Sequence, residues 1–397
     1  QKTAYEILRC LVGSAMCIRD RYIMEVKRIN KGDEVVENFT RNKILEMSDS
    51  LKRLAAIYGR WNFGGIIKNQ LSESAYTLEK IMDMRPDDNL YKIYANKIKK
   101  KLASKQIQTS DMFFTYNNGK LKIIITAWMK NGCYKSEILS DIIGNIVGKD
   151  LVVASECKNL ISVAPFEYIL KETAEYNCIY SKAMISKNKE DISGDSYTFV
   201  RTDDNHLIMA ISDGMGTGAV AAADSGSVMD FMEEYVAAGF DITKAPEVIN
   251  EALTYRHNDC PVTLDISDVD LNTGKVKMIK SGGAVTFIKR KNIVKYYFPS
   301  SLPLGVIDDI TSYRQEEMLC DGDYLIMISD GVADSLPFYD KEKQLVRIIS
   351  ETKEEKPERM AEHILEECRY YNGISNKDDM TVLVLGIWNR KSLQREI

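Results

Sequence analysis

Two stretches of the chain are near copies of each other. Residues 207–214 read LIMAISDG, and residues 325–331 read LIMISDG. Each is an apolar run typical of a buried strand, and each delivers an aspartate, Asp213 or Asp330, at its end. The glycine that follows lets the backbone turn sharply, which suits a carboxylate that must be held as a ligand for a hard cation. One Asp-Gly pair most often marks only a turn, whereas two copies favour a shared site.

Two further acidic motifs accompany this pair. Asp195 lies in SGDS at 193–196, and Asp378 and Asp379 lie in NKDDMT at 376–381. Packing carboxylates together is unfavourable unless cations neutralise them, and oxygen-only ligation selects Mg²⁺ or Mn²⁺ over zinc. Two such ions can lower the pKa of a bridging water, direct it at phosphorus and clamp the phosphoryl oxygens. The pattern indicates metal-assisted hydrolysis of a phosphoester. No cysteine is followed six positions later by arginine, so a thiolate-based phosphatase loop is absent from the sequence.

In chain order the motifs read Gly-Asp, Ser-Asp-Gly-Met-Gly-x-Gly, Ser-Asp-Gly and Asp-Asp-Met-Thr. This series resembles the PPM (protein phosphatase 2C-like) family and, within it, the sporulation-type branch. SGGA at 281–284 and SLPLG at 301–305 support the match, which covers about residues 175–388. The resemblance implies an α+β fold, a PPM phosphatase β-sandwich of two antiparallel sheets flanked by helix pairs. It also implies a protein serine/threonine phosphatase in which a water activated by two metal ions attacks phosphoserine or phosphothreonine.

The resemblance also assigns the site. Four aspartates would be catalytic and would hold two Mn²⁺ or Mg²⁺ ions, with one bridging carboxylate and one backbone carbonyl. The four are Asp195, Asp213 as the bridging residue, Asp330 and Asp378, and the carbonyl is that of Gly214. Many relatives have Asp-Asn where this chain has Asp378-Asp379, so Asp379 is a second candidate ligand there. The leaving-group acid stays unassigned, because none of the three histidines lies in a catalytic motif.

Substrate and partners follow from the resemblance alone. It implies a phosphorylated anti-sigma-factor antagonist as the protein substrate, in sporulation control, and leaves self-association through the N-terminal helices open. Relatives carry membrane-spanning segments ahead of a helical region. No run of about 18 apolar residues occurs here, so membrane association would require a segment upstream of this chain. Eight scattered cysteines without a Cys-x-x-Cys pair otherwise favour the cytoplasm.

Charge is unevenly distributed along the chain. Residues 1–110 hold 21 Lys and Arg against 13 Asp and Glu, and the remainder holds 32 against 45. The first part therefore carries about +8 and the rest about −13. Binding to nucleic acid needs a basic stripe, so neither a nucleic-acid partner nor a two-metal nuclease is expected.

Periodicity predicts how the chain is organised. Apolar stripes at helical spacing predict helices over 41–60, 67–82 and 91–102, and the period changes to that of strands from residue 112. Asn117-Asn118-Gly119 predicts a tight hairpin turn, Gly148 the end of a helix from 136, and Thr243 the cap of a helix to 256. Further strands are predicted at 183–200, 206–212, 262–271, 276–280, 285–289, 293–298, 323–329 and 381–388, and further helices at 217–238 and 356–371.

These elements suggest five segments. Residues 10–21 resemble translated adapter sequence, so we expect a non-native leader over 1–21. The segments are that leader, a helical linker or regulatory region (22–106), a small α/β segment (107–174), the phosphatase domain (175–388) and a tail (389–397). Strands interrupted by helix pairs favour antiparallel sheets in an α+β domain over a βαβ array.

Two other functions fit part of the pattern. GMGTGA at 214–219 follows a strand and opens a helix, as a nucleotide-binding loop does, but it leaves the second Ser-Asp-Gly and the Asp-Asp-Met-Thr unexplained. A catalytically silent phosphatase-fold scaffold would keep the fold for protein binding. The loss of one of the four aspartates would be its signature, and all four are present.

Overall fold

The computed structural model describes most of the chain from residue 88 onward and three short pieces before it. The described residues are 48–49, 52–53, 71–76, 88–117, 119–155, 157–187, 193–202, 204–214, 219–237, 240–255, 261–298, 301–307, 310–337, 339–372 and 378–390. They fall into two compact units, a smaller one within 78–174 and a larger one drawn from 46–77 and 175–390. The leader, most of the tail and most of the first two predicted helices lie outside the described residues.

The smaller unit is an antiparallel sheet of strand order β1-β2-β6-β4. Buried and half-buried side chains alternate along β2, the pattern of a strand with one face in a core. That core includes Ile98 of α4 and Ile143 of α5, so α4, within the segment expected to be a linker, packs with the sheet. The elements are α4 (Asp88–Ala103), β1 (Ile107–Asn117), β2 (Lys120–Met129), β3 (Tyr134–Lys135), α5 (Glu137–Val147), β4 (Leu151–Val153), β5 (Leu160–Ile161) and β6 (Phe166–Glu172).

Three local predictions for this unit are confirmed. Strands β1 and β2 form the expected hairpin, and Gly119 in its turn has a φ of 75°. Helix α5 ends before Gly148, which adopts the left-handed conformation and donates its N–H to the carbonyl of Gly144. The predicted third helix is α4.

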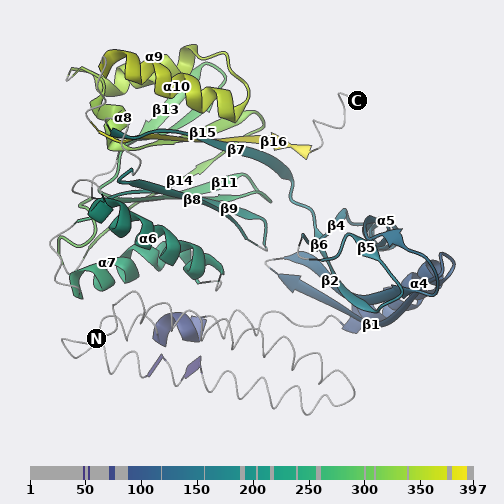
Figure 1. Ribbon diagram of the computed structural model, residues 1–397. Coiled ribbons are helices and arrows are strands. Elements are labelled where there is room, and N and C mark those ends of the chain that lie inside the picture. The colour runs from purple at the N-terminus through teal and green to yellow at the C-terminus, as the bar shows by residue number, and fades with distance from the viewer. Residues whose placement is uncertain are drawn as a thin grey trace. The chain divides into compact units, whose positions relative to one another are not determined.

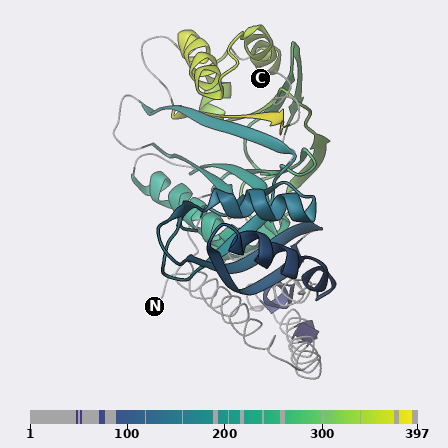
Figure 2. The same cartoon turned by 90° about the vertical axis from the view of Figure 1, so that its right-hand side faces the viewer.

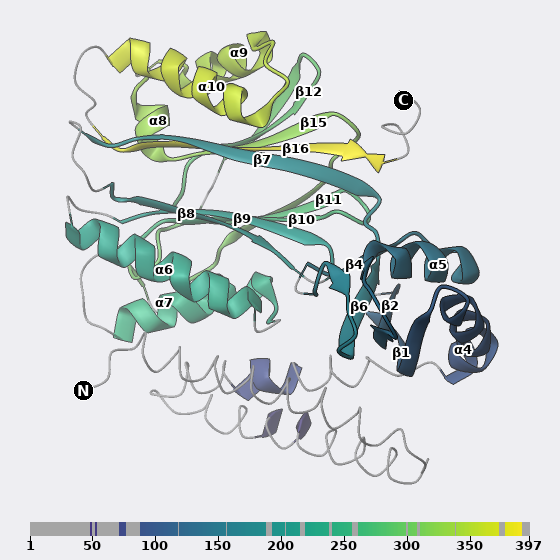
Figure 3. The same ribbon diagram turned by 45° about the vertical axis from the view of Figure 1, so that its right-hand side comes forward.

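The larger unit is a sandwich of two five-stranded antiparallel sheets (Figures 1 and 3). One sheet has the order β14-β11-β10-β9-β8 and the other β13-β12-β15-β16-β7, which confirms the predicted α+β sandwich. The strands are β7 (Tyr176–Ile185), β8 (Asp195–Arg201), β9 (His206–Asp213), β10 (Leu264–Asp270), β11 (Lys275–Ser281), β12 (Thr286–Arg290), β13 (Ile293–Tyr297), β14 (Tyr313–Met318), β15 (Asp323–Ile328) and β16 (Met380–Asn389).

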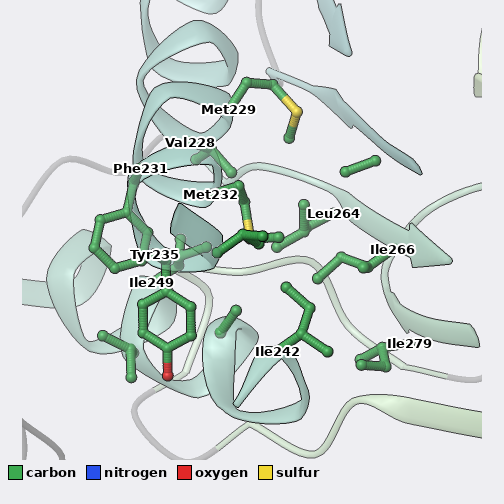
Figure 4. Close-up of a cluster of buried hydrophobic side chains, with 14 of the residues drawn as sticks. Val228, Met229, Phe231, Met232, Tyr235, Ile242, Ile249, Leu264, Ile266 and Ile279 are labelled. Atoms are coloured by element: carbon green, nitrogen blue, oxygen red, sulfur yellow. The ribbon is translucent and has the colours of Figure 1, made fainter. Parts of the chain in front are cut away.

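Helices cover the outer face of each sheet, as the two perpendicular views show (Figures 1 and 2). Helices α6 and α7 pack on the sheet that contains β9, and Figure 4 shows side chains such as Met232 of α6 and Ile266 of β10 meeting in that core. Helices α8, α9 and α10 pack on the other sheet around Ile326 and Val384. The helices are α6 (Ala219–Ala237), the 3₁₀ turn η2 (Ile242–Lys244), α7 (Ala245–Tyr255), α8 (Asp330–Asp334), α9 (Lys341–Glu351) and α10 (Pro357–Asn372).

Two local predictions for this unit are corrected. Thr243 is not the cap of a helix that begins there, because the Asp241 side chain accepts a hydrogen bond from the Thr243 N–H and Thr243 lies inside η2. The strand predicted over 183–200 is two strands, β7 and β8, which belong to different sheets. Periodicity predicted neither β14 nor α9, which the structure adds.

Candidate functional site

Asp195 and Asp213 lie opposite each other on neighbouring strands. Asp195 begins β8, Asp213 ends β9, and the two are partners in the antiparallel register. Directly opposed residues point to the same face, with Cβ atoms about 5 Å apart. Thr263 fixes this strand end, because its Oγ1 accepts from the Asp213 N–H at 3.0 Å and its own N–H donates to the Asp213 carbonyl at 2.9 Å.

Asp330 comes from the facing sheet. It follows β15 and begins α8, and it lines the same small cavity as Asp213. The two carboxyl groups are close enough that each affects the pKa of the other. The two Ser-Asp-Gly copies therefore meet across the sandwich, one from each sheet.

Asp378 and Asp379 have different environments. Asp379 accepts two backbone hydrogen bonds at 2.7 Å, one from the Lys187 N–H to Oδ1 and one from the Gly194 N–H to Oδ2. It thereby holds the turn that presents Asp195. Asp378 is exposed, its Oδ1 accepts the Asp379 N–H at 3.0 Å, and its charge acts on Asp213 and Asp330. Of the two neighbours, Asp378 is the better placed to ligate an ion.

Asp195 is the most enclosed of these carboxylates, with 4% of its surface exposed. Its Oδ2 accepts from Thr381 Oγ1 at 2.6 Å, whereas its Oδ1 has no hydrogen-bond partner in the described part of the chain. Burial raises the pKa of Asp195 to about 7, against the hydrogen bonds from Thr381 and Ser329. A buried carboxylate oxygen without a hydrogen-bond partner is suited to a cation.

The other carboxyl groups also hold protons above their ordinary range. Burial, followed by the charges of Asp330 and Asp195, raises the pKa of Asp213 to about 9. Desolvation raises the pKa of Asp330 as well, with the charge of Asp378 adding to it. Residue Asp330 as a whole is exposed, so this desolvation is local to the carboxyl group that faces Asp213. A cluster that binds protons this firmly carries excess negative potential, which divalent cations would neutralise.

Helix α6 packs directly against the ends of the two strands that carry Asp195 and Asp213. A Cβ on Gly214 would overlap the Ala221 carbonyl oxygen, so the strand end approaches the helix backbone as closely as only glycine permits. Ser225 of the same helix donates through Oγ to the Gly194 carbonyl at 2.6 Å. The position of α6 is therefore coupled to both strand ends.

The donor chemistry at the site is that of a hard-metal centre. All the side-chain donors of Asp195, Asp213, Asp330 and Asp378 are carboxylate oxygens, which suit Mg²⁺ or Mn²⁺. Within the described residues, no three acidic, histidine or cysteine side chains are already arranged so as to hold an ion.

Sequence reasoning missed the residues that orient these carboxylates. Thr381 and Ser329 stand inside the motifs, and their pairing at 2.9 Å, from the Thr381 N–H to Ser329 Oγ, joins β16 to the end of β15. Thr263 and Ser225 lie 50 and 31 residues from their backbone partners. No local pattern marks them, because their role depends on how distant strands pair.

The nucleotide-binding alternative gains no support from the fold. Every strand pairing in the described chain is antiparallel, whereas a dinucleotide fold needs parallel strands joined by crossover helices. Most of the glycine-rich loop, at 215–218, lies outside the described residues.

Comparison with known proteins agrees with this geometry. The family model of stage II sporulation protein E matches residues 203–388. Stage II sporulation protein E of Bacillus subtilis (strain 168) is 28% identical over 276 residues, which is 69% of this chain and 33% of that protein. The Priestia megaterium protein of the same name is 30% identical over 250 residues, 62% of this chain and 43% of that protein.

A solved structure shares the architecture. It contains the PP2C phosphatase domain and a fragment of the regulatory domain of the cell fate determinant SpoIIE from Bacillus subtilis. It superposes with a TM-score of 0.60 at 25% identity, over 87% of this chain and 98% of that chain.

The sandwich has the fold of PP2C phosphatase domains. Within that fold, the chain is similar to stage II sporulation protein E, whose family model matches 186 of its 397 residues. It spans between a third and a half of the length of the curated relatives that it matches. Among the described residues, no helix has the length and apolar character needed to cross a bilayer.

Proposed function

We propose that this chain hydrolyses phosphoserine or phosphothreonine on a protein, with two Mn²⁺ or Mg²⁺ ions at the aspartate cluster. The observation that carries the proposal is the meeting of Asp213 and Asp330 from opposite sheets, beside the buried Asp195. Three carboxyl groups with raised pKa values in one place call for a compensating positive charge.

The residues present fit that pair of ions. Asp195, Asp213, Asp330 and Asp378 would hold the metals, with Asp213 bridging and the Gly214 carbonyl contributing. Bound ions supply Lewis acidity, which lowers the pKa of a water and neutralises phosphoryl oxygens. The protein supplies the positioning, because Thr381 orients Asp195 and Thr263 holds the strand end of Asp213. Asp379 serves the site through the backbone of the Gly194 turn rather than as a free ligand.

The substrate is proposed from family resemblance. A phosphorylated anti-sigma-factor antagonist in sporulation control would be the phosphoprotein, with the cytoplasm as the compartment. Self-association through the N-terminal helices and attachment to a membrane through an upstream segment belong to the same proposal. The described surface itself does not select among phosphoproteins.

The test is phosphate release from a phosphoserine protein by the full chain, with Mn²⁺ binding measured separately by calorimetry. We expect turnover that depends on Mn²⁺ or Mg²⁺ and disappears in excess EDTA. Asp330→Asn should abolish turnover and weaken Mn²⁺ binding, while metal-free stability is kept or raised because carboxylate repulsion falls.

The matched control is Asp340→Asn, at an exposed aspartate outside the cluster. Asp340 pairs with Lys343 at 3.0 Å, so its loss should leave turnover and Mn²⁺ affinity unchanged. Full activity in EDTA would contradict the metal mechanism. Mn²⁺ binding without turnover on any phosphoprotein would favour the silent scaffold.

A further inference from the structure

A buried ion pair lies next to the aspartate cluster. Asp265 and Lys280 are opposed on β10 and β11, and each side chain is 1% exposed. Lys280 Nζ donates to Asp265 Oδ2 at 2.5 Å and to Thr286 Oγ1 at 2.8 Å. Thr286 belongs to the other sheet, so the hydrogen bond from Lys280 to Thr286 joins the two sheets. Buried ion pairs rarely stabilise a fold more than apolar residues of similar volume would, which makes a role beyond stability worth seeking.

The second oxygen of Asp265 is what distinguishes this pair. Its Oδ1 is buried and accepts no hydrogen bond within the described part of the chain. The carboxylate packs so closely on Gly283 that a Cβ there would overlap it. Because Lys280 engages Oδ2, the carboxylate cannot rotate to satisfy Oδ1 without breaking the ion pair.

A small cavity connects this oxygen to the site. It has a volume of about 10 Å³, and its lining includes Asp265 and Gly283 together with Asp213 and Asp330. The polar side chains of Thr263 and Ser329 complete its lining, with Ile211, Ala284 and Ile328. That volume is close to the minimum for one water, and a buried water needs two to four polar partners. The cavity offers such partners.

We propose that one water in this cavity bridges Asp265 Oδ1 to the carboxylate of Asp213 or Asp330, and that Asp265 is a positioning residue of the metal site. The water donates one hydrogen to Asp265 and one to the ligand carboxylate, which fixes the direction in which that ligand presents its remaining lone pairs. Lys280 acts through Asp265 by locking its orientation. This inference rests on the proposed two-metal site and adds a residue that orients one of its ligands.

Asp265→Asn is the sharpest probe. Lys280 can only donate, so it would hold the amide oxygen and turn the amide NH₂ toward the cavity. The group that faces the cavity would then be a hydrogen-bond donor instead of an acceptor, and the volume of the side chain would hardly change. Removing partners of this kind from a metal site typically weakens metal binding 10- to 100-fold.

The experiment measures Mn²⁺ dissociation constants by calorimetry on the full chain, together with melting temperatures in EDTA. The variants are Asp265→Asn and the double variant Asp265→Leu with Lys280→Met, which replaces the ion pair with apolar volume. The control is Asp323→Asn, the same change at another buried aspartate. Asp323 is 1% exposed and pairs with Arg290 at 2.7 Å. It begins β15, whereas Asp330 follows the other end of that strand, so Asp323 lies away from the site.

We expect both Asp265 variants to remain folded and to bind Mn²⁺ at least about tenfold more weakly. Asp323→Asn should lower the melting temperature and leave Mn²⁺ affinity within twofold of the parent. A crystal structure of the parent chain should show the bridging water.

Wild-type affinity in folded Asp265→Asn would overturn the inference, as would an equal loss of affinity in Asp323→Asn or a dry cavity in the crystal. A parent chain that binds no Mn²⁺ would instead overturn the proposed function, and this inference with it.

Discussion

Neighbouring residues of one type can serve a site in unlike ways, as Asp378 and Asp379 show. Both carboxylate oxygens of Asp379 accept hydrogen bonds, from the backbone N–H groups of Lys187 and Gly194, so this carboxylate has a structural role. Within the described residues, Asp378 accepts one hydrogen bond, from the Asp379 N–H; it is exposed, and its charge acts on Asp213 and Asp330. The resemblance left open which of the two would be a metal ligand, and this difference in hydrogen bonding favours Asp378.

This difference predicts opposite phenotypes for two alanine variants. Asp379→Ala leaves two backbone donors without partners, so it should destabilise the chain by about 1–3 kcal/mol and weaken Mn²⁺ binding indirectly. Asp378→Ala should change stability by less than about 0.5 kcal/mol, because the residue is exposed, yet weaken Mn²⁺ binding directly. Denaturant unfolding in EDTA and calorimetry with Mn²⁺ check both; equal stability losses in the two variants would contradict the assignment.

Single residues differ in how far the sequence reveals them. The four aspartates stand in motifs whose order is specific, so the sequence alone is enough to single them out as candidate ligands. Thr263, Ser225 and Asp265 cannot be identified in that way, because a threonine, a serine or an aspartate in a strand or helix is common and gains its role only through a partner strand far along the chain. Asp265 is harder still, since an aspartate is normally expected at the surface and not inside a core.

Helix α6 connects the site to the rest of the larger unit. It reaches the Asp195 strand through Ser225 and the Asp213 strand through the contact between Gly214 and Ala221. Because the contact between Gly214 and Ala221 leaves no room for a side chain, any side chain at position 214 must displace the helix, the strand end or both.

Two glycine-to-alanine changes test this contact. Gly214→Ala should destabilise the chain by about 1–3 kcal/mol through overpacking and weaken Mn²⁺ binding. Gly226→Ala lies within α6, where the nearest atom to a new Cβ is Ser196 Oγ at 3.9 Å, so it should stabilise by roughly 0.5–1 kcal/mol through helix propensity. Melting curves and Mn²⁺ titrations of the two variants measure this, and a Gly214→Ala chain with parental stability and affinity would disprove the close contact.

The elements that escaped sequence prediction did so for physical reasons. Strand β14 reads YRQEEM, with side chains that alternate between half-buried and exposed; an edge strand with so little apolar content has no hydrophobic period to detect. The helix cap at 243 was misplaced because Asp241, two residues earlier, offers the stronger acceptor. Periodicity did predict the strands with apolar runs, such as β9 and β15, and helix α10, whose apolar residues recur at helical spacing.

At the scale of the whole molecule, the larger unit recruits residues from far upstream. Glu73, within the helical residues 71–76, is buried near Tyr235 of α6 and Asp241, next to η2. Burial raises the pKa of Glu73 to about 7, opposed by the Asp241 backbone hydrogen bond and reinforced by the charge of Asp241. Residues before the smaller unit in sequence thus pack on the helix pair that covers the sheet of Asp195 and Asp213.

This contact predicts a pH dependence. The pKa of Glu73 is higher in the folded chain, about 7, than its ordinary value of 4.5, so its contribution to stability is full below about pH 4.5 and is lost as pH rises through 7. Glu73→Gln should therefore reduce the fall in unfolding free energy between pH 5 and pH 8 by about 1–3 kcal/mol.

Saturating Mn²⁺ should suppress the titration of the aspartate cluster in the parent and Glu73→Gln chains. The difference between their two pH profiles then reports on Glu73. Unfolding curves at several pH values provide the measurement. Parallel pH profiles in the parent and Glu73→Gln chains would show that Glu73 is not enclosed as described.

The hydrogen bonds that assemble the site join residues at opposite ends of the larger unit in sequence. Thr381 reaches Asp195 across 186 positions, and Asp379 reaches the Lys187 amide across 192. Strand β16, which carries Thr381, lies between β15 and β7 in its sheet, so that sheet has a gap until this strand is made. During synthesis a ribosome would have released nearly all of the domain before the four aspartates could meet. Contacts of such long range also form slowly, because the loop they close is entropically expensive. The aspartate cluster of a nascent chain should therefore stay incomplete until β16 has folded into place.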